Sequence, residues 1–151
     1  MRLKRSSQNS KRGISMSAKD CMCQEAGLLV FPCSGSSDVG ELSDRVGRMI
    51  AKCGQAKMFC LAGIGAHIPG MIESAKAARK IISIDGCPVS CAKKTLEHAG
   101  FQVESYNLKD LGFEKGKTKV DENSIKTAVS KITGGKSETT SSRSSNDCCA
   151  K

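Results

Sequence analysis

Four cysteines of this chain stand at positions from which their thiols could act together. Cys33, Cys60 and Cys87 each follow a short apolar run, and Cys91 lies four residues after Cys87. If the apolar runs are parallel strands, their carboxyl ends lie at one edge of a sheet, which is the edge where open α/β folds build their sites. Four thiolates at such an edge suit a soft metal ion: zinc, iron or copper(I). The pattern therefore predicts metal binding by these four cysteines.

The segment around Cys87 favours this chemistry and also suggests an alternative. We expect a helix from Pro88 to Ala99, so that Cys87 stands at its start and shares a helix face with Cys91. The amino terminus of a helix stabilises a thiolate. The two cysteines could then hold one ion together, or they could be the reactive pair of a thiol–disulfide redox or thiol-transfer enzyme. A free cysteine can also pack as a small hydrophobic side chain, which accounts for Cys53 at the end of an apolar helix face.

The elements that must position these cysteines alternate along the chain. Short apolar runs predict strands, and apolar residues at helical spacing between Gly or Pro residues predict helices. Such alternation, with nearly continuous apolar strands, indicates a parallel sheet covered on both faces. The predicted fold is an α/β three-layer sandwich with a central, mostly parallel sheet of about four strands, Rossmann-like or flavodoxin-like. The expected strands are 28–32, 57–61, 80–84 and 103–108, and the expected helices are 39–52, 69–78, 88–99 and a last one capped by Asp121.

The net charge of +9 is concentrated near the two ends of the chain. Residues 20–113 carry ten basic and ten acidic side chains, whereas residues 1–19 carry six basic and no acidic ones. A neutral body with few aromatic side chains argues against nucleic acid as a partner. We therefore predict three parts: a basic disordered leader (1–25), an α/β domain (26–133) and a disordered Ser/Gly-rich tail (134–151).

The cellular compartment is predicted from cysteine usage and from the apolar runs. No run is long enough to span a membrane, so no transmembrane segment is expected. Nine cysteines in a chain that can bury its own core indicate a reducing compartment rather than an extracellular disulfide framework. The expected location is the cytoplasm. The alternative is that the basic, Ser-rich leader targets the chain to an organelle.

Two other motifs near the cysteines are incomplete. The loop that follows Cys33 is similar to the phosphate loop of small tyrosine phosphatases, but Val39 stands where the required Arg belongs. The segment Gly63-Ile64-Gly65 begins like a dinucleotide-binding motif, but Ile68 replaces the third glycine. Phosphatase activity and dinucleotide binding are therefore not predicted.

Two further side chains could support the predicted site. His67 lies in the loop after the second strand and could be a ligand, a proton carrier or a hydrogen-bonded histidine near a helix start. Asp85 precedes the Gly-Cys turn and is expected to accept hydrogen bonds from backbone or thiolate-bearing groups. The remaining cysteines are expected outside the site: Cys21, Cys23, Cys148 and Cys149.

The motifs around the four cysteines resemble those of the DGC-domain proteins, a family described as zinc-binding and named for an Asp-Gly-Cys motif. The matching segments are Asp85-Gly86-Cys87-Pro88 with Cys91, Cys33-Ser34-Gly35, and Lys57 to Gly65. The resemblance covers about residues 27–116. It implies that the family's four characteristic cysteines are Cys33, Cys60, Cys87 and Cys91, and that zinc is their ion.

The expected function is therefore that of a zinc-binding protein with a structural or metal-handling role. A thiol redox or thiol-transfer enzyme that uses Cys87 and Cys91 is the alternative. A pure interaction module with incidental thiols is a third possibility, and the sequence names no protein partner.

Overall fold

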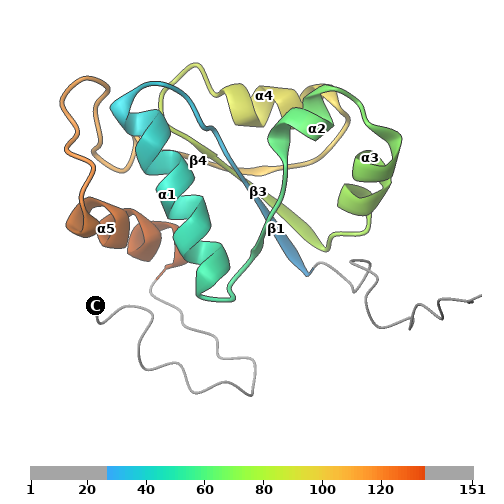
Figure 1. The fold of residues 1–151 in the computed structure, drawn as a ribbon, viewed down its shortest axis with the longest axis horizontal. Coiled ribbons are helices and arrows are strands. Elements are labelled where there is room, and N and C mark those ends of the chain that lie inside the picture. Colours follow the sequence, from blue (N-terminus) through green and yellow to red (C-terminus); the bar gives the residue numbers. More distant parts are fainter. Residues whose placement is uncertain (1–26, 135–151) are drawn as a thin grey trace, which may run out of the picture.

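A computed structural model describes residues 27–134, which form a four-stranded sheet flanked by helices (Figure 1). The strands are β1 (Leu28–Pro32), β2 (Lys57–Met58), β3 (Lys80–Asp85) and β4 (Glu104–Asn107). They lie in the order β2-β1-β3-β4, and every pair is parallel. This is the flavodoxin-like strand order, so the predicted parallel sheet is confirmed. The predicted leader (1–25) and all but the first residue of the predicted tail (134–151) lie outside the described residues.

The five helices of the described segment cover both faces of the sheet (Figure 1). Helices α1 (Asp38–Lys52) and α5 (Glu122–Thr133) pack against each other on one face. Helices α2 (Leu61–Gly65), α3 (Pro69–Lys76) and α4 (Cys91–His98) lie on the other face. The predicted three-layer α/β arrangement is therefore confirmed.

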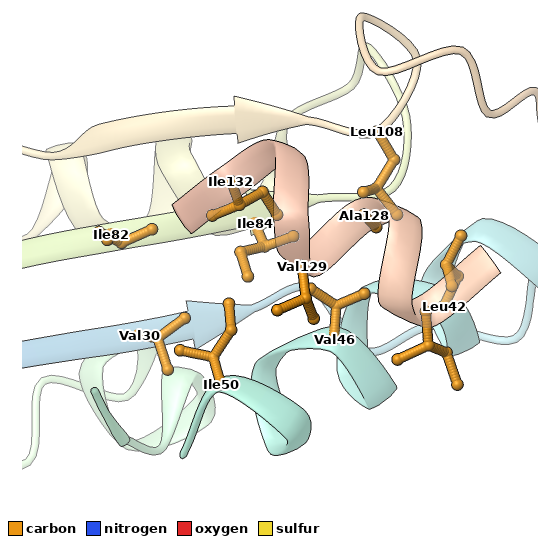
Figure 2. Packing of buried hydrophobic residues seen from close by; sticks show 11 residues of the cluster. Val30, Leu42, Val46, Ile50, Ile82, Ile84, Leu108, Ala128, Val129 and Ile132 are labelled. Carbon is orange, nitrogen blue, oxygen red and sulfur yellow. The ribbon is translucent and has the colours of Figure 1, made fainter. Parts of the chain in front are cut away.

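The strands face both helical layers because alternate side chains of a strand point to opposite sides. On the side of α1 and α5, Val30 and Ile82 meet apolar residues of these helices, as Figure 2 shows. On the other side, Leu29 and Ile81 pack with Ile64 and Leu96. The first core consists of Val30, Leu42, Val46, Ile50, Ile82, Ile84, Leu108, Ile125, Ala128, Val129 and Ile132.

The second strand is shorter than predicted. The apolar run 57–61 was expected to be one strand, but β2 ends at Met58 and helix α2 begins at Leu61. The backbone N–H of Phe59 still donates to the Val30 carbonyl at 3.0 Å, after which the chain turns into the helix at Cys60. Apolar residues alone do not distinguish a strand from a buried helical turn, which explains the error.

The fourth helix starts later than predicted. Helix α4 begins at Cys91, not at Pro88, because Ser90 has a left-handed backbone conformation with φ +54°. The preceding residues form a turn in which the Ser90 N–H donates to the Cys87 carbonyl at 3.1 Å. The prediction that Cys87 starts this helix and shares a face with Cys91 is therefore wrong. Cys91 itself is the first residue of the helix.

Candidate functional site

The four predicted cysteines, which we call the cysteine site, all lie where the chain leaves the carboxyl edge of the sheet. Cys33 directly follows β1, and its N–H donates to the Ile84 carbonyl at 2.8 Å. Cys87 follows β3 after one intervening glycine. Cys60 immediately precedes α2, and Cys91 is the first residue of α4.

Cys33 and Cys87 flank the point where the strand order reverses direction. The chain passes from β1 to β2 on one side and from β3 to β4 on the other. Connections that leave in opposite directions open a crevice at the carboxyl ends of the two central strands. Ligand sites of doubly wound proteins lie in this crevice, so the two cysteines occupy the position that the topology favours for a site.

Cys87 and Cys91 act electrostatically on the thiol of Cys33. Burial raises the pKa of the Cys33 thiol, and the negative charges of Asp85, Cys91 and Cys87 raise it further. A side-chain hydrogen bond with Cys91 acts in the same direction. Cys33 and Cys87 are partly buried, whereas Cys91 is exposed, and all three are free thiols. The structure thus brings these three cysteines together around the half-buried thiol of Cys33.

Cys60 lies at the same end of the molecule on the neighbouring helix. Helices α2 and α4 are in contact, and a Cβ placed on Gly65 would stand 3.3 Å from Cγ2 of Thr95. Both helices start at the carboxyl edge of the sheet, with Cys60 and Cys91 at their amino-terminal ends. Cys60 is exposed and is not among the groups with the largest effects on the Cys33 pKa. It is therefore the outermost member of the cysteine site.

Residues 27–134 contain no group of three or more His, Cys, Asp or Glu side chains already arranged to hold a metal ion. The thiolate set is suitable for zinc in its chemistry, since structural zinc sites use four cysteines. Side chains of the exposed Cys60 and Cys91 would have to turn inward to complete a tetrahedron. Convergence of all four sulfurs on one ion stays a prediction.

Asp85 organises the loop that separates Cys87 from Cys91. Its buried carboxylate accepts hydrogen bonds from the backbone N–H groups of Ala92, at 2.8 Å, and Lys93, at 3.1 Å. Burial raises the pKa of Asp85, while these two hydrogen bonds act in the opposite direction. The end of β3 thus caps the first turn of α4, whose preceding residue Ser90 makes no side-chain cap. The predicted role as a backbone acceptor is confirmed.

Gly86 allows the Cys87 loop to lie directly on the start of α1. A Cβ at Gly86 would stand 2.6 Å from the carbonyl oxygen of Val39, closer than real Cβ contacts come. A similar contact lies next to it, because a Cβ at Gly40 would stand 2.9 Å from the backbone of Gly35. These contacts hold the loops after β1 and β3 together.

Asn107 is a site residue that the sequence did not indicate. Its Nδ2 donates to the Cys87 carbonyl at 2.8 Å from the carboxyl end of β4. Its Oδ1 accepts from the N–H of Lys109 at 3.0 Å, which fixes the orientation of the amide. A polar residue at a strand's carboxyl end, level with Asp85 in the sheet register, was the signal that could have identified it.

A cavity of about 350 Å³ adjoins Cys87 on the side of β4. The sequence did not indicate this cavity, because most of its walls come from an irregular segment after β4. Two of the lining residues are lysines, Lys109 and Lys115, and one is an aromatic residue, Phe113. The others are Gly86, Cys87, Pro88 and Glu114.

His67, a predicted candidate for the site, and Cys53, a predicted core residue, both differ from expectation. His67 follows the carboxyl end of α2, away from Cys60, and its ring packs edge-on against that of His98 with centroids 5.5 Å apart. Cys53 was expected in the core, but it is only partly buried and forms the carboxyl cap of α1.

The fold and this arrangement of thiols define a doubly wound α/β protein with cysteines at its topological switch point. The family model of the DGC domain matches residues 29–132, so the chain belongs to the DGC-domain family. The chain is also similar to the anaerobic and virulence modulator AnvM of Pseudomonas aeruginosa. The two are 37% identical over 88 residues, which is 58% of this chain and 67% of AnvM. No solved structure matches the chain.

The family predicted by resemblance is therefore confirmed. Between residues 27 and 134, no helix combines the length and apolar character that crossing a membrane requires.

Proposed function

We propose that this protein binds one soft metal ion, zinc in the first place, through the thiolates of Cys33, Cys60, Cys87 and Cys91. Its role would be structural or metal-handling. The observation that carries the proposal is the placement of Cys33 and Cys87 at the switch point between β1 and β3, where Cys87 and Cys91 act on the Cys33 thiol. Membership of the DGC-domain family is consistent with it.

The electrostatics of Cys33 support a cation at this place. Burial disfavours the Cys33 thiolate, and the negative charges of Asp85, Cys91 and Cys87 disfavour it further. A divalent cation would reverse this effect, because it compensates the repulsion between thiolates and favours their deprotonation. Binding would therefore favour release of the Cys33 proton, which burial and the neighbouring charges retain in the metal-free protein.

Cys60 would provide the fourth thiolate from the adjacent strand end. It precedes α2, which packs against α4, and its exposed side chain can change rotamer at little cost. Strand β2 pairs with β1 at only two residues, so the Cys60 segment can adjust more readily than the central strands.

Metal content of the anaerobically purified protein tests the proposal, together with thiol counting before and after chelation. We expect about one zinc per chain and loss of metal in each of four Cys→Ser variants, because a structural zinc site needs all four ligands. Cys53→Ser is the matched control, since it removes a thiol outside the cysteine site and should keep the metal. Metal-free protein after anaerobic purification that also takes up no added zinc would contradict the proposal.

A thiol redox function is the second candidate, and one contact favours a different reactive pair from the one that the sequence suggested. The sequence suggested Cys87 and Cys91 as the reactive pair, but the hydrogen bond from Cys91 is with Cys33. In this version the two thiols of Cys33 and Cys91 form a disulfide, and their electrons and protons pass to a disulfide substrate, which becomes two thiols. A metal-free protein with a reversible Cys33–Cys91 disulfide in peptide mapping would favour this candidate.

A further inference from the structure

The cavity beside Cys87 is formed by two loops that are each fixed by specific contacts. The Cys87 loop is held by Asn107, which bonds the Cys87 carbonyl, and by Gly86 against α1. The opposite wall is held by Asp38, whose carboxylate accepts hydrogen bonds from the N–H groups of Gly116, at 2.8 Å, and Thr118, at 3.0 Å. The cavity is therefore preformed, as small-molecule sites usually are.

Phe113 forms an apolar wall of the same cavity. Its N–H donates to the Leu108 carbonyl at 2.9 Å, and its ring packs against the core between the sheet and helices α1 and α5. The ammonium group of Lys131 lies 6.0 Å from the ring centroid. Together with Pro88, which also lines the cavity, Phe113 provides a surface for a short apolar segment of a ligand.

The charge of the cavity is positive. Lys109 and Lys115 both line it, and neither is part of an ion pair within residues 27–134. The single lining carboxylate, Glu114, is already paired with Lys117 at 2.7 Å. Two uncommitted ammonium groups next to a compensated carboxylate favour an anionic ligand.

We propose that this cavity binds a low-molecular-weight thiol that carries carboxylates. Its carboxylates pair with Lys109 and Lys115, its stem lies between Phe113 and Pro88, and its sulfur reaches the cysteine site at Cys87. A volume of about 350 Å³ accommodates a molecule of the size of a small peptide thiol. This proposal adds a ligand to the metal-binding function proposed above. The role of the ligand's sulfur rests on that function.

The bound thiol would act in ligand exchange on the metal ion. Its S–H bond breaks, its thiolate bonds to the metal, and one protein thiolate leaves the metal and takes up the proton. No electrons are transferred, so no oxidant is needed. Cys91 is the protein ligand to be displaced, because it is exposed and is the first residue of α4, directly after the loop that contains Cys87. The cavity is then the entry and exit point for the metal.

Binding to the metal-free full chain tests the cavity independently of the metal. Calorimetry should detect saturable binding of reduced glutathione and of S-methylglutathione, but not of glutathione diethyl ester, which lacks both carboxylate charges. The double variant Lys109→Gln/Lys115→Gln should bind glutathione at least about tenfold more weakly, since two charge-assisted contacts are lost. Lys52→Gln removes a positive charge at the end of α1, away from the cavity, and should bind as the wild type does.

Zinc transfer to a chromogenic chelator tests the exchange step. Glutathione should accelerate the transfer, and the rate should saturate as its concentration rises. S-methylglutathione should not accelerate it. In the double lysine variant the rate should no longer saturate with glutathione. Equal binding of the diethyl ester, or unchanged binding by the lysine variant, would overturn the proposal. A protein that binds glutathione through the lysines but holds no zinc would refute the metal function and the exchange step while leaving the cavity assignment intact.

Discussion

The carboxylate of Asp85 lies 2.8 Å from the backbone nitrogen of Ala92 and caps a helix that begins six residues after it. The last residue of β3 therefore fixes where α4 starts, and with it the position of Cys91. The Asp of the Asp-Gly-Cys motif is a positioning residue for the cysteine site. It contacts the protein backbone.

Removing this cap should destabilise the protein. Asp85→Ala leaves two N–H groups at the start of α4 without an acceptor, and we expect the free energy of unfolding to fall by about 2 kcal/mol. Asp85→Asn retains one acceptor and should lose less. Urea denaturation measures both. Asp110→Ala removes an exposed carboxylate in a turn and is the control, and an equal effect of the two alanine variants would refute the capping role.

The charge of Asp85 should also control the reactivity of Cys33. Burial is the first cause of the raised pKa of Cys33, and the Asp85 charge is the second, so Asp85→Asn should lower this pKa. More thiolate is then present at a given pH below the pKa, and Cys33 should react faster with iodoacetamide. Alkylation rates from peptide mass spectrometry over a pH series measure the shift, with Asp110→Asn as control. A pKa that stays in place or rises would contradict this expectation.

The raised pKa has a defined effect on stability. The folded protein binds the Cys33 proton more tightly than the unfolded chain does. Stability from this group is therefore present below the ordinary thiol pKa and lost as the pH rises through the raised one. Because Asp85→Asn reduces the difference, the metal-free variant should lose less stability than the wild type when urea denaturation is repeated at alkaline pH.

Gly86 should not tolerate a side chain. The added Cβ of Gly86→Ala would meet the Val39 carbonyl, and the resulting shift of the loop should cost about 1–3 kcal/mol of unfolding free energy. Gly70→Ala is the matched control, because a Cβ there meets nothing within 4 Å in the described part of the chain and the residue lies in helix α3. The control should be neutral or up to about 1 kcal/mol more stable. Equal melting temperatures of Gly86→Ala and Gly70→Ala would be incompatible with the close contact at Gly86.

Two fully buried serines should respond in opposite ways to replacement by alanine. The Ser43 hydroxyl donates to the Ile84 carbonyl at 2.7 Å, so Ser43→Ala should destabilise the protein by about 1 kcal/mol. Within residues 27–134 the Ser83 hydroxyl has no hydrogen-bond partner, so Ser83→Ala should be neutral or stabilising. Urea midpoints of the two variants give the comparison directly. A greater loss of stability in Ser83→Ala would show that its hydroxyl has a partner.

The strand–helix alternation and the sheet could be predicted because each strand is a compact apolar run. Leu28–Pro32 and Lys80–Asp85 are buried on both faces. Such strands are continuous apolar runs, which can be recognised in the sequence without knowledge of tertiary contacts. Helix ends with local caps were also predictable: the Asp121 side chain accepts from the N–H of Ser124 at 2.9 Å, as its sequence position indicates.

The errors arise where contacts distant in the chain determine the local conformation. The residues from Pro88 onward suit a helix, but Asn107 holds the Cys87 carbonyl and Asp85 caps the chain only from Ala92. The contact with Asn107, which lies 20 residues along the chain from Cys87, cannot be inferred from neighbouring residues. The Lys109–Lys115 wall was missed for the same reason, since Asp38 fixes it from a distance of 78 residues along the chain.

The contact between Gly86 and Val39 also limits how this sequence can diverge. When two side chains touch, a larger one can be matched by a smaller neighbour in a later generation. Here the neighbour is a carbonyl group, which every residue type carries and no substitution can shorten. Variation at position 86 therefore has no compensating partner position, and only an insertion or deletion that rebuilds the connection from β3 to α4 could accompany it.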